Sequence, residues 1–138
     1  MGPSTLPSVT PALHYRDAPE AIRFLTDVLG FEENFVVPGH DGSILHAELR
    51  WRNGFVFLRS AGPDTVAVGG ATVCLVLESG NAVDAHYERA VAGGADIVER
   101  LADTPFGSHQ YSARDPEGNV WVFGTYQPTP VPAVSSTP

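Results

Sequence analysis

Cysteine is nearly absent from this sequence, because Cys74 is the only one among 138 residues. An intrachain disulfide is therefore excluded. Cys74 lies in the apolar run from Val73 to Leu77. A lone cysteine in such a run usually behaves as a small buried side chain, so we expect it in the core rather than in a catalytic role.

Long apolar runs are also missing. No stretch reaches the roughly 18 residues that a membrane-spanning helix needs. Residues 1–11 are rich in proline, serine and threonine and lack the basic segment that opens a signal peptide. We therefore expect a soluble cytoplasmic protein with no membrane partner.

Basic residues are scarce: 8 arginines and no lysine stand against 16 acidic residues, and the formal net charge is −8. Nucleic acid is therefore not an expected partner, since affinity for it comes mostly from basic side chains on phosphates. The acidic excess suits a cationic ligand and does not oppose an apolar one, but it also serves plain solubility.

The length and composition fit one domain, and 43% hydrophobic residues are enough for a core. Residues 1–9 and 127–138 are Pro/Ser/Thr-rich tracts without periodicity, which predicts disorder. The single domain is expected over residues 10–126.

The first half of this domain predicts one strand, one helix and three more strands. Asp17 can cap the helix, Glu20 can complete a capping box, and Gly30 can end the helix in a left-handed conformation. The alternation of apolar residues and the turns between them predict strands at residues 10–15, 31–37, 43–51 and 55–60.

The second half repeats the same order about 64 positions later. Asn81 can cap its helix, and Gly93 and Gly94 can end it. The strands expected here are residues 71–78, 96–102, 108–114 and 120–126, with a tight turn at 115–119. The sequence thus predicts an α+β fold of two tandem βαβββ modules, at about 10–60 and 71–126, whose mixed sheets curl around a concave cavity. An unrelated α+β sandwich with a chance internal similarity is the alternative.

Strand alternation predicts which side chains face that cavity. In the third strand Leu45, Ala47 and Leu49 are expected beneath the helix. The inward set is then His14, His46, Glu48, Arg50, Phe55, Phe57 and Arg59, with Thr72, Cys74 and Val76 from the second half. Aromatic rings mixed with a few polar groups are typical of a pocket for an organic ligand. The alternative is that these polar groups only face solvent.

Several motifs resemble those of the vicinal oxygen chelate superfamily, which includes glyoxalase I, extradiol dioxygenases, fosfomycin-resistance enzymes and bleomycin-binding proteins. The motifs are residues 16–25, 29–31, 46–49, 85–90, 93–95, 106–108 and 115–121. The sequence is most similar to the PhnB-like or bleomycin-resistance-like branches.

The resemblance implies four metal-ligand positions, and none carries a metal ligand here. They correspond to Thr10, Thr72, Phe57 or Leu58, and Val122. A metal site needs three or four nitrogen, oxygen or sulfur donors, so we expect no metal and no other cofactor. An off-pattern site built from His14, His46, Glu48 and His109 stays open. His40 and His86 are expected at the surface, and Trp121 in the core.

Three functions follow from these observations. The resemblance to the bleomycin-resistance branch implies a homodimer that binds a small molecule without catalysis, and the aromatic lining favours an aromatic antibiotic or metabolite that is sequestered for self-resistance. The residues expected to bind it are His14, His46, Glu48, Arg50, Trp51, Phe55, Phe57, Phe106, His109 and Tyr111. The second is a metal-free lyase or isomerase with His14, His46 and Glu48 as catalytic groups. The third is the same kind of enzyme with a divalent metal.

Overall fold

The computed structural model describes residues 7–132 of the chain and contains two modules of the predicted βαβββ order. The first module consists of β1 (Ala12–Tyr15), α1 (Ala18–Arg23) continued by the π-helical turn η1 (Phe24–Val28), β2 (Glu32–Pro38), the short 3-10 turn η2 (His40–Gly42), β3 (Ile44–Trp51) and β4 (Gly54–Ser60). The second consists of β5 (Thr72–Val76), α2 (Gly80–Ala92), β6 (Asp96–Asp103), β7 (His109–Arg114) and β8 (Val120–Gly124).

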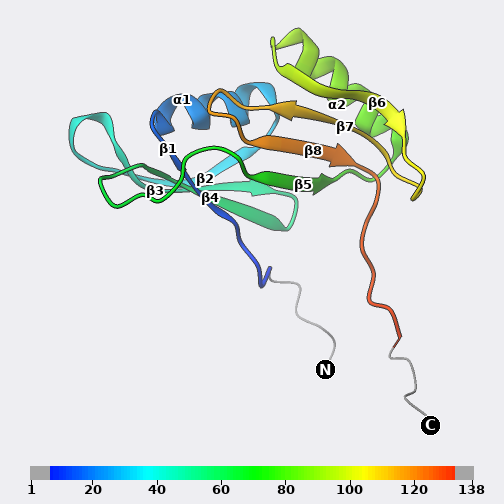
Figure 1. Cartoon of the computed structure of the whole chain (residues 1–138), viewed down its shortest axis with the longest axis horizontal. Coiled ribbons are helices and arrows are strands. Elements are labelled where there is room, and N and C mark those ends of the chain that lie inside the picture. Colours follow the sequence, from blue (N-terminus) through cyan, green and yellow to red (C-terminus); the bar gives the residue numbers. More distant parts are fainter. Residues whose placement is uncertain (1–6, 133–138) are drawn as a thin grey trace.

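Each module forms a four-stranded mixed sheet, and the two sheets have the same strand order. They run β1-β4-β3-β2 and β5-β8-β7-β6, with β1 parallel to β4, β5 parallel to β8 and the other neighbours antiparallel. Figure 1 shows both helices on one side of the molecule and both chain ends leaving on the other. The predicted fold, α+β with two curled mixed sheets, is confirmed.

The two tracts predicted to be disordered lie partly outside the described residues. Of the tracts expected to be disordered, residues 1–6 and 133–138 lie outside it, while residues 7–9 and 127–132 form no helix or strand. None of the helices described for residues 7–132 is long and apolar enough to span a membrane.

The start of the first helix follows the sequence signals. The Asp17 side chain accepts a hydrogen bond from the Glu20 N–H at 3.2 Å, and Gly30 has the left-handed φ of 81° that ends the helical segment. In the second helix the expected cap is wrong. Ser79, with an extended backbone, accepts from the Ala82 N–H at 3.1 Å, so the helix begins two residues early and Asn81 lies inside its first turn.

The core lies between each helix and the sheet face beneath it. In the second sheet Leu75, Ala113, Trp121 and Phe123 are buried, and so is Tyr111, which was expected to bind a ligand. In the first sheet the buried strand residues alternate as predicted: Leu13, Tyr15, Ala47, Leu49, Val56 and Leu58. Leu45 is an exception, because its side chain is 62% exposed. The β2–β3 register shifts between Val37 and Pro38, whose partners are His46 and Ile44, so Leu45 is left without a partner on β2.

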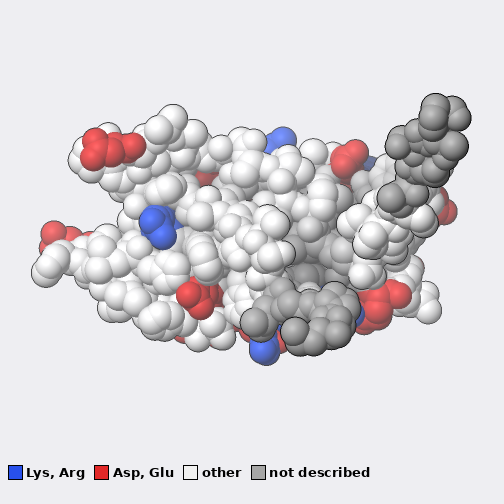
Figure 2. All heavy atoms as spheres, turned by 90° about the horizontal axis from the view of Figure 1, so that it is seen from below, with Lys and Arg blue, Asp and Glu red and all other residues white. Residues whose placement is uncertain are grey.

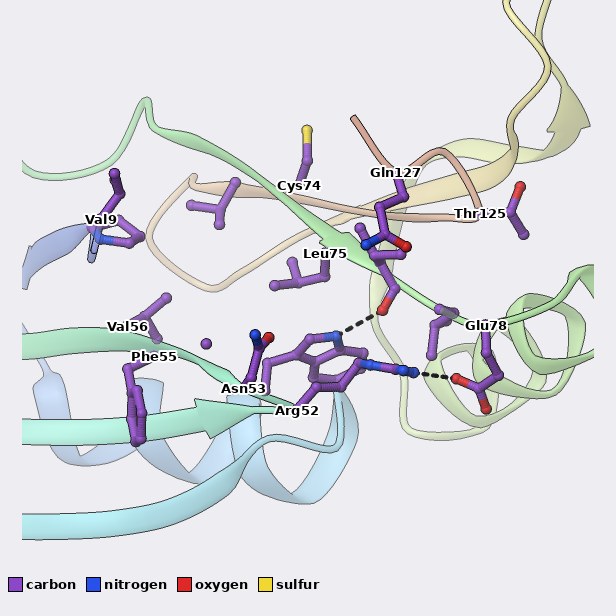
Figure 3. A pocket seen from close by; sticks show the side chains of 16 residues that line it. Val9, Arg52, Asn53, Phe55, Val56, Cys74, Leu75, Glu78, Thr125 and Gln127 are labelled. Atoms are coloured by element: carbon purple, nitrogen blue, oxygen red, sulfur yellow. Dashed lines mark hydrogen bonds and ion pairs between the residues drawn. The ribbon is translucent and has the colours of Figure 1, made fainter. Parts of the chain in front are cut away.

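The expectation of a buried Cys74 is wrong, since its side chain is exposed. Only one face of the second sheet is covered by α2, and Leu75 lies on that covered face. Cys74 lies on the opposite face, with Thr72 and Val76, as strand alternation predicts. Figure 3 shows the Cys74 thiol and the Leu75 side chain pointing in opposite directions.

The second module holds the first helical segment at both ends. The Glu117 carboxylate accepts hydrogen bonds from the backbone N–H groups of Arg16 (2.6 Å) and Asp17 (2.7 Å) at its start. At its end, the His86 ring donates to the Leu29 carbonyl at 2.7 Å, and Arg89 lies 3.3 Å from the Asp27 carbonyl. The Glu117 carboxylate at the start and the Arg89 guanidinium at the end match the helix dipole.

Two residues expected elsewhere form the contact between the modules. His86 is 9% exposed rather than a surface residue, because α2 turns it toward η1. The Trp51 ring lies on the helix side of its sheet, with its centroid 5.0 Å from Phe31, 5.4 Å from His86 and 5.3 Å from Phe123.

Candidate functional site

The open face of the first sheet, the one turned away from α1, carries the side chains that alternation assigns to it. Alternate residues of β3 and β4 are buried, while His46, Glu48, Phe55 and Phe57 between them are half-buried. Glu48 lies directly opposite Phe57 in the β3–β4 ladder. The sheet thus places a histidine, a carboxylate and an aromatic ring side by side.

His46 and Glu48 form a hydrogen-bonded pair. The His46 Nε2 and Glu48 Oε2 atoms are 2.9 Å apart, and each side chain is 26% exposed. The Asn34 amide donates to the other Glu48 oxygen at 2.9 Å. These hydrogen bonds, first that of His46 and then that of Asn34, lower the pKa of the Glu48 carboxyl. The pair therefore presents an ionised carboxylate whose two oxygens are both oriented.

Two aromatic rings flank this pair. The His46 ring centroid lies 4.9 Å from that of Phe57, with the ring planes tilted by 58°, and 6.3 Å from that of Phe35 in an edge-on arrangement. Phe35 is 48% exposed. A ligand on this face would therefore meet an imidazole between two phenyl rings. Viewed from this side, uncharged side chains make up most of the visible described surface and charged ones are scattered (Figure 2).

Asn34 and Phe35 are site residues that the sequence analysis missed. They lie in β2, where the run Glu32, Glu33, Asn34, Phe35 has no apolar alternation and the pairing with β3 shifts register between Glu33 and Phe35. The one feature of the sequence that pointed to a site here was an aromatic residue, Phe35, directly after an acidic segment.

The other residues predicted on this face lie apart from the pair. His14 is half-buried and lines a shallow cavity of about 400 Å³ with residues 62–67. No hydrogen bond joins it to His46 or Glu48 within residues 7–132. Arg50 makes an exposed ion pair of 2.9 Å with Glu32 at the far end of the strand.

Four predicted binding residues lie away from the open face. Trp51 and Tyr111 are on the helix sides of their sheets, and Tyr111 is fully buried. Phe106 is 59% exposed in the β6–β7 turn, edge-on to Tyr126. His109 lies in the second module beside the start of α2, apart from His46. The structure does not bring these side chains together with the His46–Glu48 pair.

Both ring nitrogens of His109 are occupied by carboxylates. Nε2 lies 2.6 Å from Asp84 and Nδ1 lies 2.8 Å from Asp103. These hydrogen bonds, that of Asp84 first, raise the pKa of His109. A ring bound on both sides has no free nitrogen to offer a substrate, so its role is to tie α2 to β6.

The donor set does not fit the metal that the family resemblance implies. His46 and Glu48 give two donors, and residues 7–132 contain no group of three His, Cys, Asp or Glu side chains placed to hold a metal ion. Thr10, Thr72, Phe57, Leu58 and Val122 supply no ligand of the usual kind. Independence from metal stays a prediction.

A family model described as the Glyoxalase/Bleomycin resistance protein/Dioxygenase superfamily matches residues 8–123. The chain belongs to this superfamily. An uncharacterised protein of Mycobacterium bovis is 32% identical over 126 residues, which cover 86% of this chain and 82% of that one.

Solved structures show the same superfamily fold. TioX from Micromonospora sp. ML1 is 36% identical, with a TM-score of 0.71 over 86% of this chain and 98% of that chain. Lactoylglutathione lyase from Agrobacterium tumefaciens is 24% identical, with a TM-score of 0.66 over 86% of this chain and 94% of that chain. At that identity the second likeness supports the fold alone. The superfamily contains both binding proteins and enzymes, so the choice between them depends on the site.

Proposed function

We propose that this protein binds a small organic molecule with aromatic rings on the open face of the first sheet, holds it without a metal ion and releases it unchanged. The observation that carries the proposal is the His46–Glu48 pair placed between the rings of Phe57 and Phe35. Sequestration of an aromatic antibiotic or metabolite is the corresponding biological role.

The chemistry of the face supports an aromatic ligand. Aromatic rings attract one another in offset or edge-on geometry by about 0.5–1.5 kcal/mol per pair beyond the burial of surface. The Glu48 carboxylate, oriented by His46 and Asn34, can accept a hydrogen bond from a donor group and so set the direction of the ligand. Phe35, Phe55 and Phe57 supply the apolar part of the face, which suits an aromatic body, while Arg50 and Arg59 are exposed on its β3 and β4 strands.

A homodimer would cover the open face of the first sheet and turn it into a groove. No helix of residues 7–132 lies over the open face of either sheet. A flat open face encloses too little of a ligand for tight binding. Family membership supports a second copy as the missing cover. The pairing of modules between two chains is part of this proposal.

A lyase or isomerase is the second candidate, and the geometry of the same pair favours it. His46 lies within hydrogen-bond distance of Glu48, so the carboxylate can orient the ring and the ring can exchange a proton with a bound substrate. His14, the third predicted catalytic residue, has no hydrogen bond to this pair in the described part of the chain.

A thermal-shift screen tests the proposal. The panel holds bleomycin, anthraquinones and enediyne-type compounds beside Ni²⁺, Zn²⁺, Mn²⁺ and Fe²⁺. A ligand at about 100 times its Kd adds roughly 2.7 kcal/mol to the free energy of unfolding, which raises Tm by several degrees. We expect a shift with a polycyclic compound that persists in the presence of a chelator and gives no product.

Variants then separate the two candidates. Phe57→Ala should weaken the binding of the compound that gives the shift, while Val91→Ala, at an exposed position of α2, should not. If His46→Ala abolishes conversion of a compound that the wild type turns over, the enzyme is the correct candidate. A shift caused by metal ions alone would overturn the metal-free proposal.

A further inference from the structure

A cleft of about 700 Å³ lies between the two modules, apart from the His46–Glu48 pair. One wall is the β3–β4 hairpin, residues 51–56, and the other is β5 with the residues after it, 73–78 (Figure 3). Val9, Pro11, Thr125 and Gln127 complete the lining. Cavities of about 300–1,000 Å³ are typical of sites for organic ligands.

The unpaired side of β5 forms the second wall. Ala71 and Leu77, just beyond the ends of this strand, both make backbone hydrogen bonds to the β8 side. In a parallel ladder the backbone groups of alternate residues point to opposite sides. Odd-numbered residues of β5 therefore pair with β8, and the N–H and C=O groups of Thr72, Cys74 and Val76 point to the open side.

A contact from the hairpin shows that this open side faces the cleft. The Trp51 indole N–H donates to the Val76 carbonyl at 3.1 Å. No other hydrogen bond reaches the outward backbone groups of Thr72, Cys74 and Val76 within residues 7–132. A row of peptide groups is thus available on one wall of a cleft that apolar and polar side chains line together.

The remaining lining fits the side chains of a peptide. Phe55, Val56 and Leu75 line the cleft, while Asn53 and Gln127 carry amides (Figure 3). At one end the Arg52–Glu78 ion pair joins the two walls and limits the length of the cleft. A hydrocarbon ligand would leave the peptide groups of β5 without partners, whereas an extended peptide satisfies them and fills the apolar space.

We propose that this cleft binds an extended peptide, which adds to β5 as an outer strand. Backbone hydrogen bonds to Thr72, Cys74 and Val76 supply the recognition, and alternate side chains lie against the hairpin. The cleft shares Phe55 with the open face but contains neither His46, Glu48 nor Phe57, so either proposal can fail alone.

A matched pair of variants at Cys74 tests this inference. The probe is a fluorescein-labelled peptide, Gly-Val-Thr-Val-Thr-Val-amide, and its binding is followed by fluorescence anisotropy. Cys74→Pro removes an N–H that points to the cleft and leaves the ladder to β8 intact, because proline is tolerated on the free side of an edge strand. We expect Cys74→Pro to weaken binding about tenfold or more. Cys74→Ala, which changes only a thiol that points away, should retain it.

Amide hydrogen exchange in the wild-type protein gives a second test that needs no variant. On addition of the peptide, the N–H groups of Thr72, Cys74 and Val76 should exchange more slowly, while those of Val73 and Leu75 should not change. Only alternate N–H groups of the peptide face β5. Of two peptides, one N-methylated at its valines and one at its threonines, at least one should therefore bind less well than the unmethylated peptide. Equal binding to both Cys74 variants, unchanged exchange on β5, or no binding to the wild type at about 1 mM peptide would overturn the proposal. Self-association through β5 that leaves no room for the peptide would also overturn it.

Discussion

The Tyr15 hydroxyl donates a hydrogen bond to the Asp115 carboxylate at 2.6 Å, and both side chains are buried. Tyr15 ends the first strand of the first module, and Asp115 begins the last turn of the second. The same carboxylate accepts from the Trp121 indole at 3.0 Å and from the backbone N–H groups of Glu117 and Asn119. One acid thus holds its own turn in shape and joins that turn to the other module.

Removing this acid should destabilise the fold more than removing its tyrosine partner. Tyr15→Phe leaves Asp115 with its other donors and should cost about 1–2 kcal/mol. Asp115→Ala leaves several buried donors without an acceptor and should cost about 3 kcal/mol or more. Urea unfolding of the two variants measures both free energies. Equal losses in the two variants would contradict the view that the carboxylate organises the turn.

Alkaline titration should find two of the four tyrosines unable to ionise in the folded protein. Burial, and then the charge of Asp115, raise the pKa of Tyr15 far above its ordinary value of 10, and burial raises the pKa of Tyr111. Because the pKa is raised in the folded state, the contribution of these two tyrosines to the free energy of unfolding is complete below about pH 10 and falls as the pH rises further. The tyrosinate absorbance of two residues should therefore appear only as the circular dichroism of the fold is lost. Ionisation of all four before unfolding would refute this.

The element order was predictable because its signals are local. Apolar alternation, the cap of Asp17, the left-handed Gly30 and the turn at 115–119 each act within a few residues. The open face of the first sheet followed from the same period of two, and it brought His46, Glu48 and Phe57 together. The expectation of a buried Leu45 is wrong because the pairing of β2 with β3 shifts register there. The sequence of β3 alone does not reveal that shift.

Two of the wrong expectations, those for His86 and Trp51, concern side chains with contacts in the other module. The sequence around His86 is that of an exposed helix face, but its ring is buried by the Leu29 carbonyl and by the rings of Trp51 and Phe123. Trp51 ends an alternating strand, and its ring packs against Phe31 of its own module and Phe123 of the other. The sequence of the strand does not show that these two rings meet there. Packing of one module on the other is a long-range event that no local pattern encodes.

The His109 clamp should make stability depend on pH in the neutral range. Because Asp84 and Asp103 raise the pKa of His109, its stabilisation is complete below its ordinary value of 6.5 and is lost as the pH rises through the folded value. The difference in free energy of unfolding between the wild type and His109→Gln should therefore be largest below pH 6.5 and shrink as the pH rises above it. His40→Gln, in an exposed turn of the first module, is the control for the substitution itself. If the difference in free energy of unfolding between the wild type and His109→Gln does not change with pH, the charge of His109 does not contribute to stability.

His86 should act in the opposite direction, and this contrast separates the two histidines. Its Nε2 donates to the Leu29 carbonyl, so its Nδ1 is left to accept from the Tyr111 hydroxyl at 2.5 Å. Burial lowers the pKa of His86, which means that its stabilisation is present above 6.5 and is lost as the pH falls toward the folded value. We expect His86→Gln to be destabilised by about 1–3 kcal/mol at pH 7 and by less at about pH 5. Urea unfolding across this range measures the trend, and an NMR titration should show the wild-type ring still neutral below pH 6.5. A ring that becomes charged at its ordinary pKa while the protein stays folded would mean that water reaches it, and the tight contact between α2 and η1 would have to be abandoned.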